Sequence, residues 1–281
     1  MNEEDFQNEI DRLDELHGLT MAYFGHLSSM RSAAGCAPDS EIAGHFEEYP
    51  DSQEHLNPSY LAWRAIASAS EHAGFAEHMR YVTSGGVVNR PHASLARVTF
   101  LGASKALYVL EPDHPEERRV RAAKLANQEA KDAQSMLEVW GTQTEVPAGF
   151  LGDLERQTAQ LASSAAKILV DAGMKERTTV NDISMIKAVA PLVASHLEEA
   201  EARALMFWNR SSGISHARAW TWTTPFGVLP QFDFLETWSC PVTLLARAWE
   251  LWNLRRGAPQ FPHYPPDDWQ PDRSRWGDPP Q

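Results

Sequence analysis

A short polar stretch near the C-terminal end of the sequence holds the strongest candidates for chemistry. Residues 209–216 read NRSSGISH, with Arg210 six positions before His216. An arginine is charged at every physiological pH, so it can hold a phosphate group while negative charge builds up on the phosphate oxygens. A histidine exchanges protons near neutral pH and can act as a general acid or base. The pair therefore predicts proton transfer beside a bound phosphate, with Asn209 and Ser211 as supporting polar groups.

This pattern resembles the signature of the HEPN superfamily, helical-bundle proteins in which an arginine is followed after four to six residues by a histidine. In that family the pair lies near the penultimate and last helices, as Arg210 and His216 do here. The resemblance implies a metal-independent endoribonuclease of the toxin or defence type, whose dimerisation brings two copies of the motif together. Active members commonly have Asn, Asp or His directly after the arginine, whereas Ser211 follows it in this chain. Arg12 and His17 meet the same spacing.

A second resemblance covers more of the chain and implies no activity. Residues 58–256 look like uncharacterised helical proteins of actinobacteria, on the basis of Leu110-Glu111-Pro112, Arg118-Arg119-Val120-Arg121, Ser212-Gly213-Ile214-Ser215-His216 and Trp220. Two interpretations of the polar stretch are therefore open. It is either a catalytic site or a polar helix end at which His216 hydrogen-bonds a backbone carbonyl. In the second case the chain is a non-catalytic interaction or regulatory protein.

The histidines of this chain are not arranged like metal ligands, so we expect neither a metal site nor a cofactor. The pairs Glu71-His72 and Glu77-His78 lie six residues apart, which places them on different faces of a helix. Ser84-Gly85-Gly86 lacks the lysine that follows the glycines of a phosphate-binding loop. Histidines in polar or loop surroundings are expected at the surface, namely His17, His45, His55, His92, His114 and His263.

The negative charge of the chain is concentrated at its N-terminal end. The net charge is −13, and residues 1–60 contain 13 acidic and 2 basic side chains. Residues 61–281 hold the other 25 acidic and 23 basic side chains, so this part is almost neutral. A protein that binds duplex DNA normally presents a broad basic face, so we expect no duplex DNA as a partner. We expect the acidic first helix to be a solvated face or to dock a protein partner such as an antitoxin.

The N-terminal residues and the cysteines predict a cytoplasmic protein. The start, MNEEDF, lacks a basic segment followed by an apolar run, so we expect no signal peptide. No stretch approaches the roughly 18 uninterrupted apolar residues of a membrane-spanning helix. Cys36 and Cys240 are too few for a secreted disulfide scaffold, and we expect both to be thiols.

Apolar residues recur at helical spacing through most of the chain, which predicts an all-α fold. We expect about seven helices, over roughly residues 3–31, 59–81, 89–110, 113–140, 151–168, 183–207 and 234–256. The sixth of these ends before Ser211-Ser212-Gly213, which we expect to interrupt it. The helices form one bundle over residues 1–256, made of the acidic helix 3–31, a loop over 32–57 and a main bundle over 58–256. Residues 257–281 contain seven prolines and predict an extended or disordered tail.

Aromatic residues are crowded in the last third of the chain. Six of the ten tryptophans lie between Trp208 and Trp252. The last helix is apolar on all sides, and a large apolar surface predicts association. We therefore expect a homodimer through this helix and the segment before it, because symmetric dimers are the commonest oligomers.

Overall fold

The computed structural model describes residues 3–29, 36–49, 55–82, 89–142, 147–193, 200–216 and 230–257. Across these residues the chain forms helices and no strand, which confirms the predicted all-α class. The helices are α1 (Glu3–Ser29), α2 (Glu41–Glu48), α3 (Pro58–Val82), α4 (Asn89–Leu110), α5 (Pro115–Trp140), α6 (Ala148–Asp171), α7 (Asp182–Val193), α8 (Ala200–Ser215) and α10 (Pro230–Arg255). The predicted tail beyond Gly257 lies outside the described residues.

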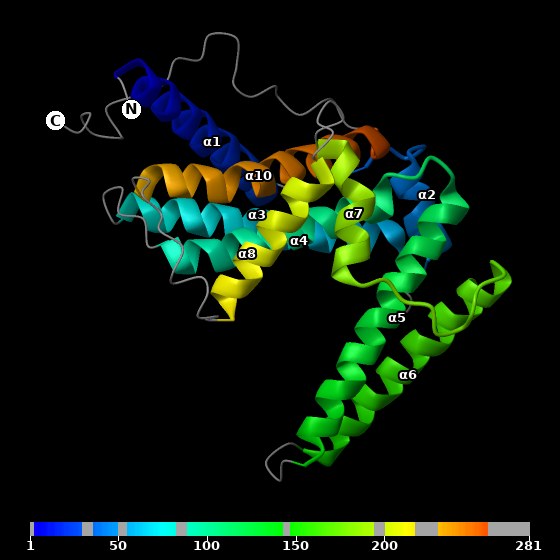
Figure 1. Ribbon diagram of the computed structural model, residues 1–281. Helices are drawn as coiled ribbons and strands as arrows, with labels where there is room; N and C mark the ends of the chain where they lie inside the picture. The colour runs from blue at the N-terminus through cyan, green and yellow to red at the C-terminus, as the bar shows by residue number, and fades with distance from the viewer. Residues whose placement is uncertain are drawn as a thin grey trace.

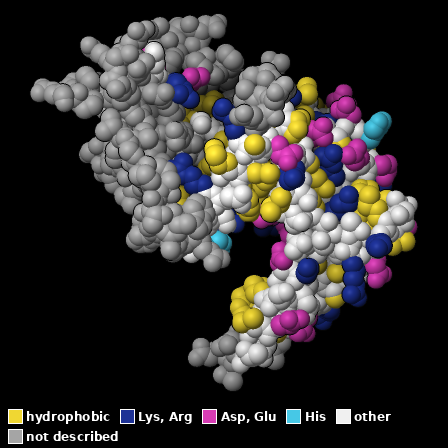
Figure 2. Space-filling view, in the orientation of Figure 1, with side chains coloured by type: hydrophobic (Ala, Val, Ile, Leu, Met, Phe, Trp, Pro, Cys, Tyr) yellow, Lys and Arg dark blue, Asp and Glu magenta, His cyan; other side chains and the backbone are white. Residues whose placement is uncertain are grey.

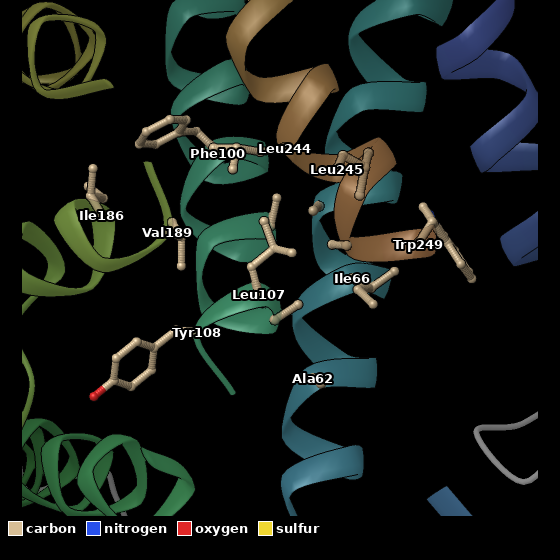
Figure 3. Close-up of a cluster of buried hydrophobic side chains, with 14 of the residues drawn as sticks. Ala62, Ile66, Phe100, Leu107, Tyr108, Ile186, Val189, Leu244, Leu245 and Trp249 are labelled. Atoms are coloured by element: carbon tan, nitrogen blue, oxygen red, sulfur yellow. The ribbon is translucent and has the colours of Figure 1, made fainter. Parts of the chain in front are cut away.

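Helix α4 is the centre of the fold. It packs against α3 and α10, and α7 and α8 cover another of its sides (Figure 1). The main core lies between these helices and includes Ile66, Phe100, Leu107 and Leu245, all of which are fully buried (Figure 3). Its central position explains why most of the side chains between residues 92 and 110 of α4 are buried.

Small residues let α3 and α4 approach closely. A Cβ atom added to Gly102 would lie 2.7 Å from the carbonyl oxygen of Ala65 and 3.1 Å from the Cβ of Ala69. In the same crossing, the hydroxyl of Thr99 donates a hydrogen bond to the carbonyl of Ala69 across 3.2 Å. The glycine is therefore needed for the separation of the two backbones.

The aromatic side chains of α10 complete the core of their own chain. Trp238, Trp249 and Trp252 are fully buried, and the Trp249 indole donates a hydrogen bond to the hydroxyl of Ser70 across 3.0 Å. The prediction that this aromatic helix forms a dimer interface is therefore wrong for these three side chains. Helices α1, α3, α4 and α7 pack against α10, whereas Thr243, Arg247 and Glu250 form an exposed polar face, so the expectation that the helix is apolar on all sides was also wrong.

Helix α1 packs with one of its faces on α3 and α10. Ile10 and Thr20 are buried, and His17 is turned inward, where its Nδ1 lies 2.8 Å from Glu77. Asp14, expected on the solvated acidic face, is buried instead. The exposed acidic face of this helix is therefore narrower than the sequence suggests.

The predicted loop over residues 32–57 contains a helix that the sequence pattern did not reveal. The hydroxyl of Ser40 accepts a hydrogen bond from the backbone N–H of Ala43 and caps the first turn of α2. Helix α2 has only eight residues, and Ile42 and His45 are its buried side chains. Two buried positions are too few to show helical periodicity, which is why this stretch reads as a loop.

The predicted sixth helix is two helices, α7 and α8, which pack against each other. The ammonium group of Lys187 lies 3.0 Å from a carboxylate oxygen of Glu201. Fourteen residues of continuous helix would separate these positions by about 21 Å. The chain therefore reverses direction between Val193 and Ala200, and Pro191 stands in the last turn of α7.

Helices α5 and α6 form an antiparallel hairpin that projects from the bundle (Figure 1). We call this hairpin the arm. A small second core near its base contains Ala123, Ala126, Ala165 and Leu169, together with Tyr49 and Leu56. Within the described residues, no helix combines the length and apolar character needed to cross a membrane.

Candidate functional site

Helix α8 continues through the predicted interruption at Ser211-Ser212-Gly213. Its last residue is Ser215, and the backbone N–H of His216 still donates to the carbonyl of Ser212 across 3.0 Å. Ser211 and Gly213 are both buried, and the hydroxyl of Ser211 donates to the carbonyl of Trp208. The side of α8 that carries Ser211 and Gly213 is buried in the bundle, and the helix runs through these residues, so the expected helix break was wrong.

The structure places the four predicted site residues at the C-terminal end of α8 with different exposures. Asn209 and His216 are exposed, Arg210 is half-buried and Ser211 is buried. Six helical steps separate Arg210 from His216, which corresponds to a rotation of about 120° and a rise of about 9 Å. The two functional groups therefore share one end of the helix but start from different sides of it.

The imidazole of His216 is exposed to solvent. Among the described residues, its side chain makes no hydrogen bond, and its ordered contact is the backbone bond to Ser212. No described carbonyl accepts a hydrogen bond from this ring, and residues 217–229, which follow directly, lie outside the described part of the chain. Ser211 has a structural role, since its hydroxyl is bound to its own helix.

The N-terminal half of α4 runs beside this end of α8. The hydroxyls of Ser94 and Ser215 lie 3.1 Å apart, and the rings of Phe100 and Phe207 lie 4.8 Å apart. Between these contacts, the guanidinium of Arg97 stacks on Trp208 at 4.3 Å from the ring centroid. Because α4 numbers rise as α8 numbers fall, Arg97 lies alongside the segment that carries the predicted site.

Arg97 is the residue that the sequence analysis did not assign. It forms no ion pair with any described residue, and its charge is held only by the face of Trp208. The Nε atom of Arg97 is buried, so the terminal N–H groups are the donors that this stacked guanidinium can offer to an anion. No sequence motif marks this residue, because its partner lies 111 positions further along the chain.

The two helical segments that meet at this end have basic residues and no carboxylate of their own. Helix α4 contains Arg97 and Lys105 without any Asp or Glu, and residues 205–216 contain Arg210 without any Asp or Glu, whereas the buried Glu77 of α3 lies near His92 of α4. In a chain with net charge −13 this is a locally basic region. Such a region attracts an anion such as a phosphate.

A second charged cluster joins α1 to α3 and is structural. The carboxylate of Glu77 is buried and accepts hydrogen bonds from His17 at 2.8 Å and from Arg80 at 2.9 Å. Burial alone would raise the pKa of Glu77, but the His17 bond and the Arg80 charge outweigh it, so the pKa is lowered. A charged carboxylate fixed by two donors stabilises the packing of α1 on α3.

Two histidines expected at the surface are buried. The Nδ1 atom of His45 lies 2.7 Å from the hydroxyl of Ser59, and burial lowers its pKa to about 4, assisted by the charge of Arg118. Burial also lowers the pKa of His92. Both are neutral near pH 7. The sequence pattern did not predict this burial, because it depends on contacts between helices. His45 of α2 is covered by α3, and His92 of α4 lies against α3.

A third cluster, of Glu41, Arg118 and Arg255, lies beside a cavity of about 590 Å³ at the C-terminal end of α10, which Glu41 and Arg255 line. The guanidinium groups of Arg118 and Arg255 both contact one oxygen of Glu41, at 3.1 and 2.7 Å. Arg118 also donates to the carbonyls of Pro112 and Asp113, and Arg255 donates to Pro112 as well. These contacts hold the turn between α4 and α5. Arg118, one of the three arginines on which the second resemblance rests, therefore has a structural role here.

Within the described residues, no group of three or more His, Cys, Asp or Glu side chains is placed to hold a metal ion. The candidate site is therefore the end of α8 beside α4, with Arg97, Arg210 and His216 as its chemical groups. No family model, curated protein or solved structure matches this chain.

Proposed function

We propose that this chain is a HEPN-like, metal-independent endoribonuclease whose site lies at the end of α8. The observation that carries the proposal is an exposed His216 within a region where α4 and residues 205–216 supply arginines and no carboxylate. RNA offers the matching chemistry, because it combines an anionic phosphate with an adjacent hydroxyl that must lose a proton.

In the proposed reaction, His216 accepts the proton of an RNA 2′-hydroxyl. The oxygen then attacks the neighbouring phosphorus, the bond from phosphorus to the 5′-oxygen of the next nucleotide breaks, and that oxygen takes up a proton. The products are a 2′,3′-cyclic phosphate and a 5′-hydroxyl end. Arg210 and Arg97 bind the phosphate oxygens, on which negative charge increases in the transition state.

The arrangement of α8 fits a site completed by two chains. Arg210 and His216 leave one helix from sides about 120° apart, so a second copy of the motif would supply a guanidinium opposite each imidazole. The HEPN resemblance implies such a pairing, and Asn209, which is exposed, would orient the phosphate.

The test is RNA cleavage in EDTA, comparing the parent protein with His216→Ala. Removal of a general acid or base costs about 10²–10⁴-fold in rate. His114→Ala is the matched control, because His114 is also exposed and its side chain makes no capping bond at the start of α5. Arg210→Lys and Arg97→Ala should also lower the rate, and DNA should not be cut. Cleavage that persists in His216→Ala, or that requires a metal ion, would refute the mechanism.

A second candidate function is a non-catalytic interaction protein, and the arm favours it. Val139 and Phe150 are large apolar side chains that stay at least half exposed near the tip of the arm. The acidic face of α1 remains a second candidate surface for a protein partner such as an antitoxin. Loss of RNA cleavage in every condition, together with retained partner binding, would favour this function.

A further inference from the structure

One side of the arm keeps large apolar side chains open to solvent near its tip. Met136 of α5 is 40% exposed, its neighbour Val139 is 61% exposed, and Phe150 of α6 is 50% exposed. The Phe150 ring stacks on Trp140 with centroids 6.3 Å apart, so the end of α5 and the start of α6 meet on this side. Hydrophobic side chains gather near the tip of the arm in Figure 2. An apolar surface on a projecting hairpin is typical of a contact with another molecule.

The apolar side chains continue from the tip along both helices of the arm. In α5, steps of three and four residues place on one side Glu129, Asp132, Met136 and Trp140. In α6, the same steps place on one side Phe150, Leu154, Gln157 and Leu161. The stack of Trp140 on Phe150 joins the two lines, and Leu154 and Leu161 are half-buried. We call these residues, together with Asp153, the arm face.

The arm face carries negative charge. Its carboxylates are Glu129, Asp132 and Asp153. Within residues 128–142 and 147–161 the cations are Lys131 and Arg156, which stand five residues before Met136 and six residues after Phe150. These steps place the two cations about 120–140° away around their helices. Arg156 forms an ion pair with Asp153, but both side chains are exposed, and pairs of this kind contribute little. The partner that best complements the arm face is therefore apolar and basic.

A helix is the element that fits against two antiparallel helices from one side. Its side chains pack along the line between them, as in a helical bundle. From Phe150 to Leu161 the arm face extends about 17 Å, or about three helical turns. A helix of that length would cover the exposed parts of Leu154 and Leu161. The carboxylates of the arm face repel phosphate groups, which disfavours RNA and anionic membranes as occupants.

We propose that the arm face binds a basic amphipathic helix of about three turns from a partner protein. The proposal rests on the second candidate function, that of an interaction protein, and states the chemistry of its partner. It uses no residue of the candidate site on α8 and does not require the ribonuclease activity. Such a contact is smaller than the roughly 800 Å² per partner of a standard interface, so we expect a dissociation constant in the micromolar range.

The first test measures binding of synthetic peptides to the purified full chain by fluorescence anisotropy. The probe is a labelled peptide of about 14 leucine and lysine residues, with the leucines at helical spacing so that one face is apolar and the other is basic. One matched peptide has glutamate in place of lysine. Another has the same leucines and lysines in an order that gives no apolar face. The probe should bind, and both matched peptides should bind at least about tenfold more weakly, because each lacks one of the two complementary features.

The second test locates the binding surface with variants of the chain. Met136→Gln combined with Phe150→Gln should weaken binding of the leucine–lysine peptide at least about tenfold, as expected for central residues of an interface. Val170→Gln is the matched control, because Val170 is 54% exposed on α6 but is turned about 160° away from Phe150. It should bind the peptide as the parent protein does. Circular dichroism checks that each variant stays folded.

A change of charge tests the basic character of the partner. Asp132→Lys combined with Asp153→Lys should weaken binding of the leucine–lysine peptide and strengthen binding of the leucine–glutamate peptide, because the arm face is then basic. An unchanged order of the two peptides would show that the charge of the arm face does not select its partner, and would overturn the proposal.

Three further results would overturn it. They are no saturable binding of the leucine–lysine peptide up to about 1 mM, equal binding of the three peptides, and equal effects of the Met136–Phe150 change and the Val170 control. Binding of the parent protein to phosphatidylcholine vesicles that is lost in the Met136–Phe150 variant would also overturn it, because the occupant would then be a membrane surface. RNA is absent from these measurements, so each such result leaves the ribonuclease activity to its own test. It also leaves the acidic face of α1 as the surface for the second candidate function.

Discussion

Replacing Gly102 by alanine should destabilise the protein, although alanine is the better helix former. The new Cβ atom would lie 2.7 Å from the Ala65 carbonyl oxygen, which belongs to the backbone of α3. A backbone atom can yield only if the whole helix moves, and movement would also strain the bond from Thr99 to the Ala69 carbonyl. Crowding costs about 1–3 kcal/mol, and a contact with a backbone atom at 2.7 Å belongs in the upper part of that range, at about 2–3 kcal/mol, against a gain of about 1 kcal/mol in helix propensity.

The expected net loss for Gly102→Ala is therefore about 1–2 kcal/mol, which corresponds to a fall in Tm of about 2–8 °C. Thermal unfolding followed by circular dichroism measures it. Gly25→Ala in α1 is the matched control, because a Cβ there meets no atom within 4 Å. That variant should be unchanged or more stable by up to about 1 kcal/mol. If Gly102→Ala were as stable as the parent, the close α3–α4 crossing would be wrong.

Two further predictions concern the cluster around α2. Because burial lowers the pKa of His45 to about 4, the native protein takes up this proton later than the unfolded chain, which takes it up near pH 6.5. The stability due to neutral His45 is therefore complete above pH 6.5 and is lost as the pH falls to about 4, by up to about 1.4 kcal/mol per pH unit. Urea unfolding over this range should give a shallower slope for His45→Gln, and an equal slope would contradict the assignment. Arg118→Lys should cost about 1–3 kcal/mol in urea unfolding at neutral pH, because an ammonium group keeps the charge but cannot serve Glu41 and two carbonyls at once. A cost below about 1 kcal/mol would contradict this role of the guanidinium. It would show that water satisfies Glu41, which is 45% exposed, when the guanidinium is lost.

The helices of the central bundle could be predicted from the sequence because each has a long pattern of apolar positions. The ranges expected for α3, α4, α5 and α6 agree with the structure to within a few residues. The same reasoning failed for α7 and α8, since the steps of three and four residues continue across the reversal between Val193 and Ala200. Apolar spacing records which positions are buried, and it does not record where the chain turns.

The candidate site was found in part from the sequence. The types and spacing of Arg210 and His216 suggested phosphate chemistry without any structure. Their positions within a continuous α8 were not predicted, because Ser211-Ser212-Gly213 normally ends a helix. In this fold the three small residues are retained in the helix, where Ser211 and Gly213 are buried.

The sequence by itself determined the helical class, the acidic N-terminal segment and the ranges of the long helices in the central bundle. Tertiary structure alone decided that Arg97 stacks on Trp208, that the tryptophans of α10 are core residues, and that the apolar end of the arm is exposed. The physical reason is that local pattern depends on neighbours within a few residues. Burial and ion pairing depend instead on side chains that are distant in sequence, such as Trp249 and Ser70, which are 179 positions apart.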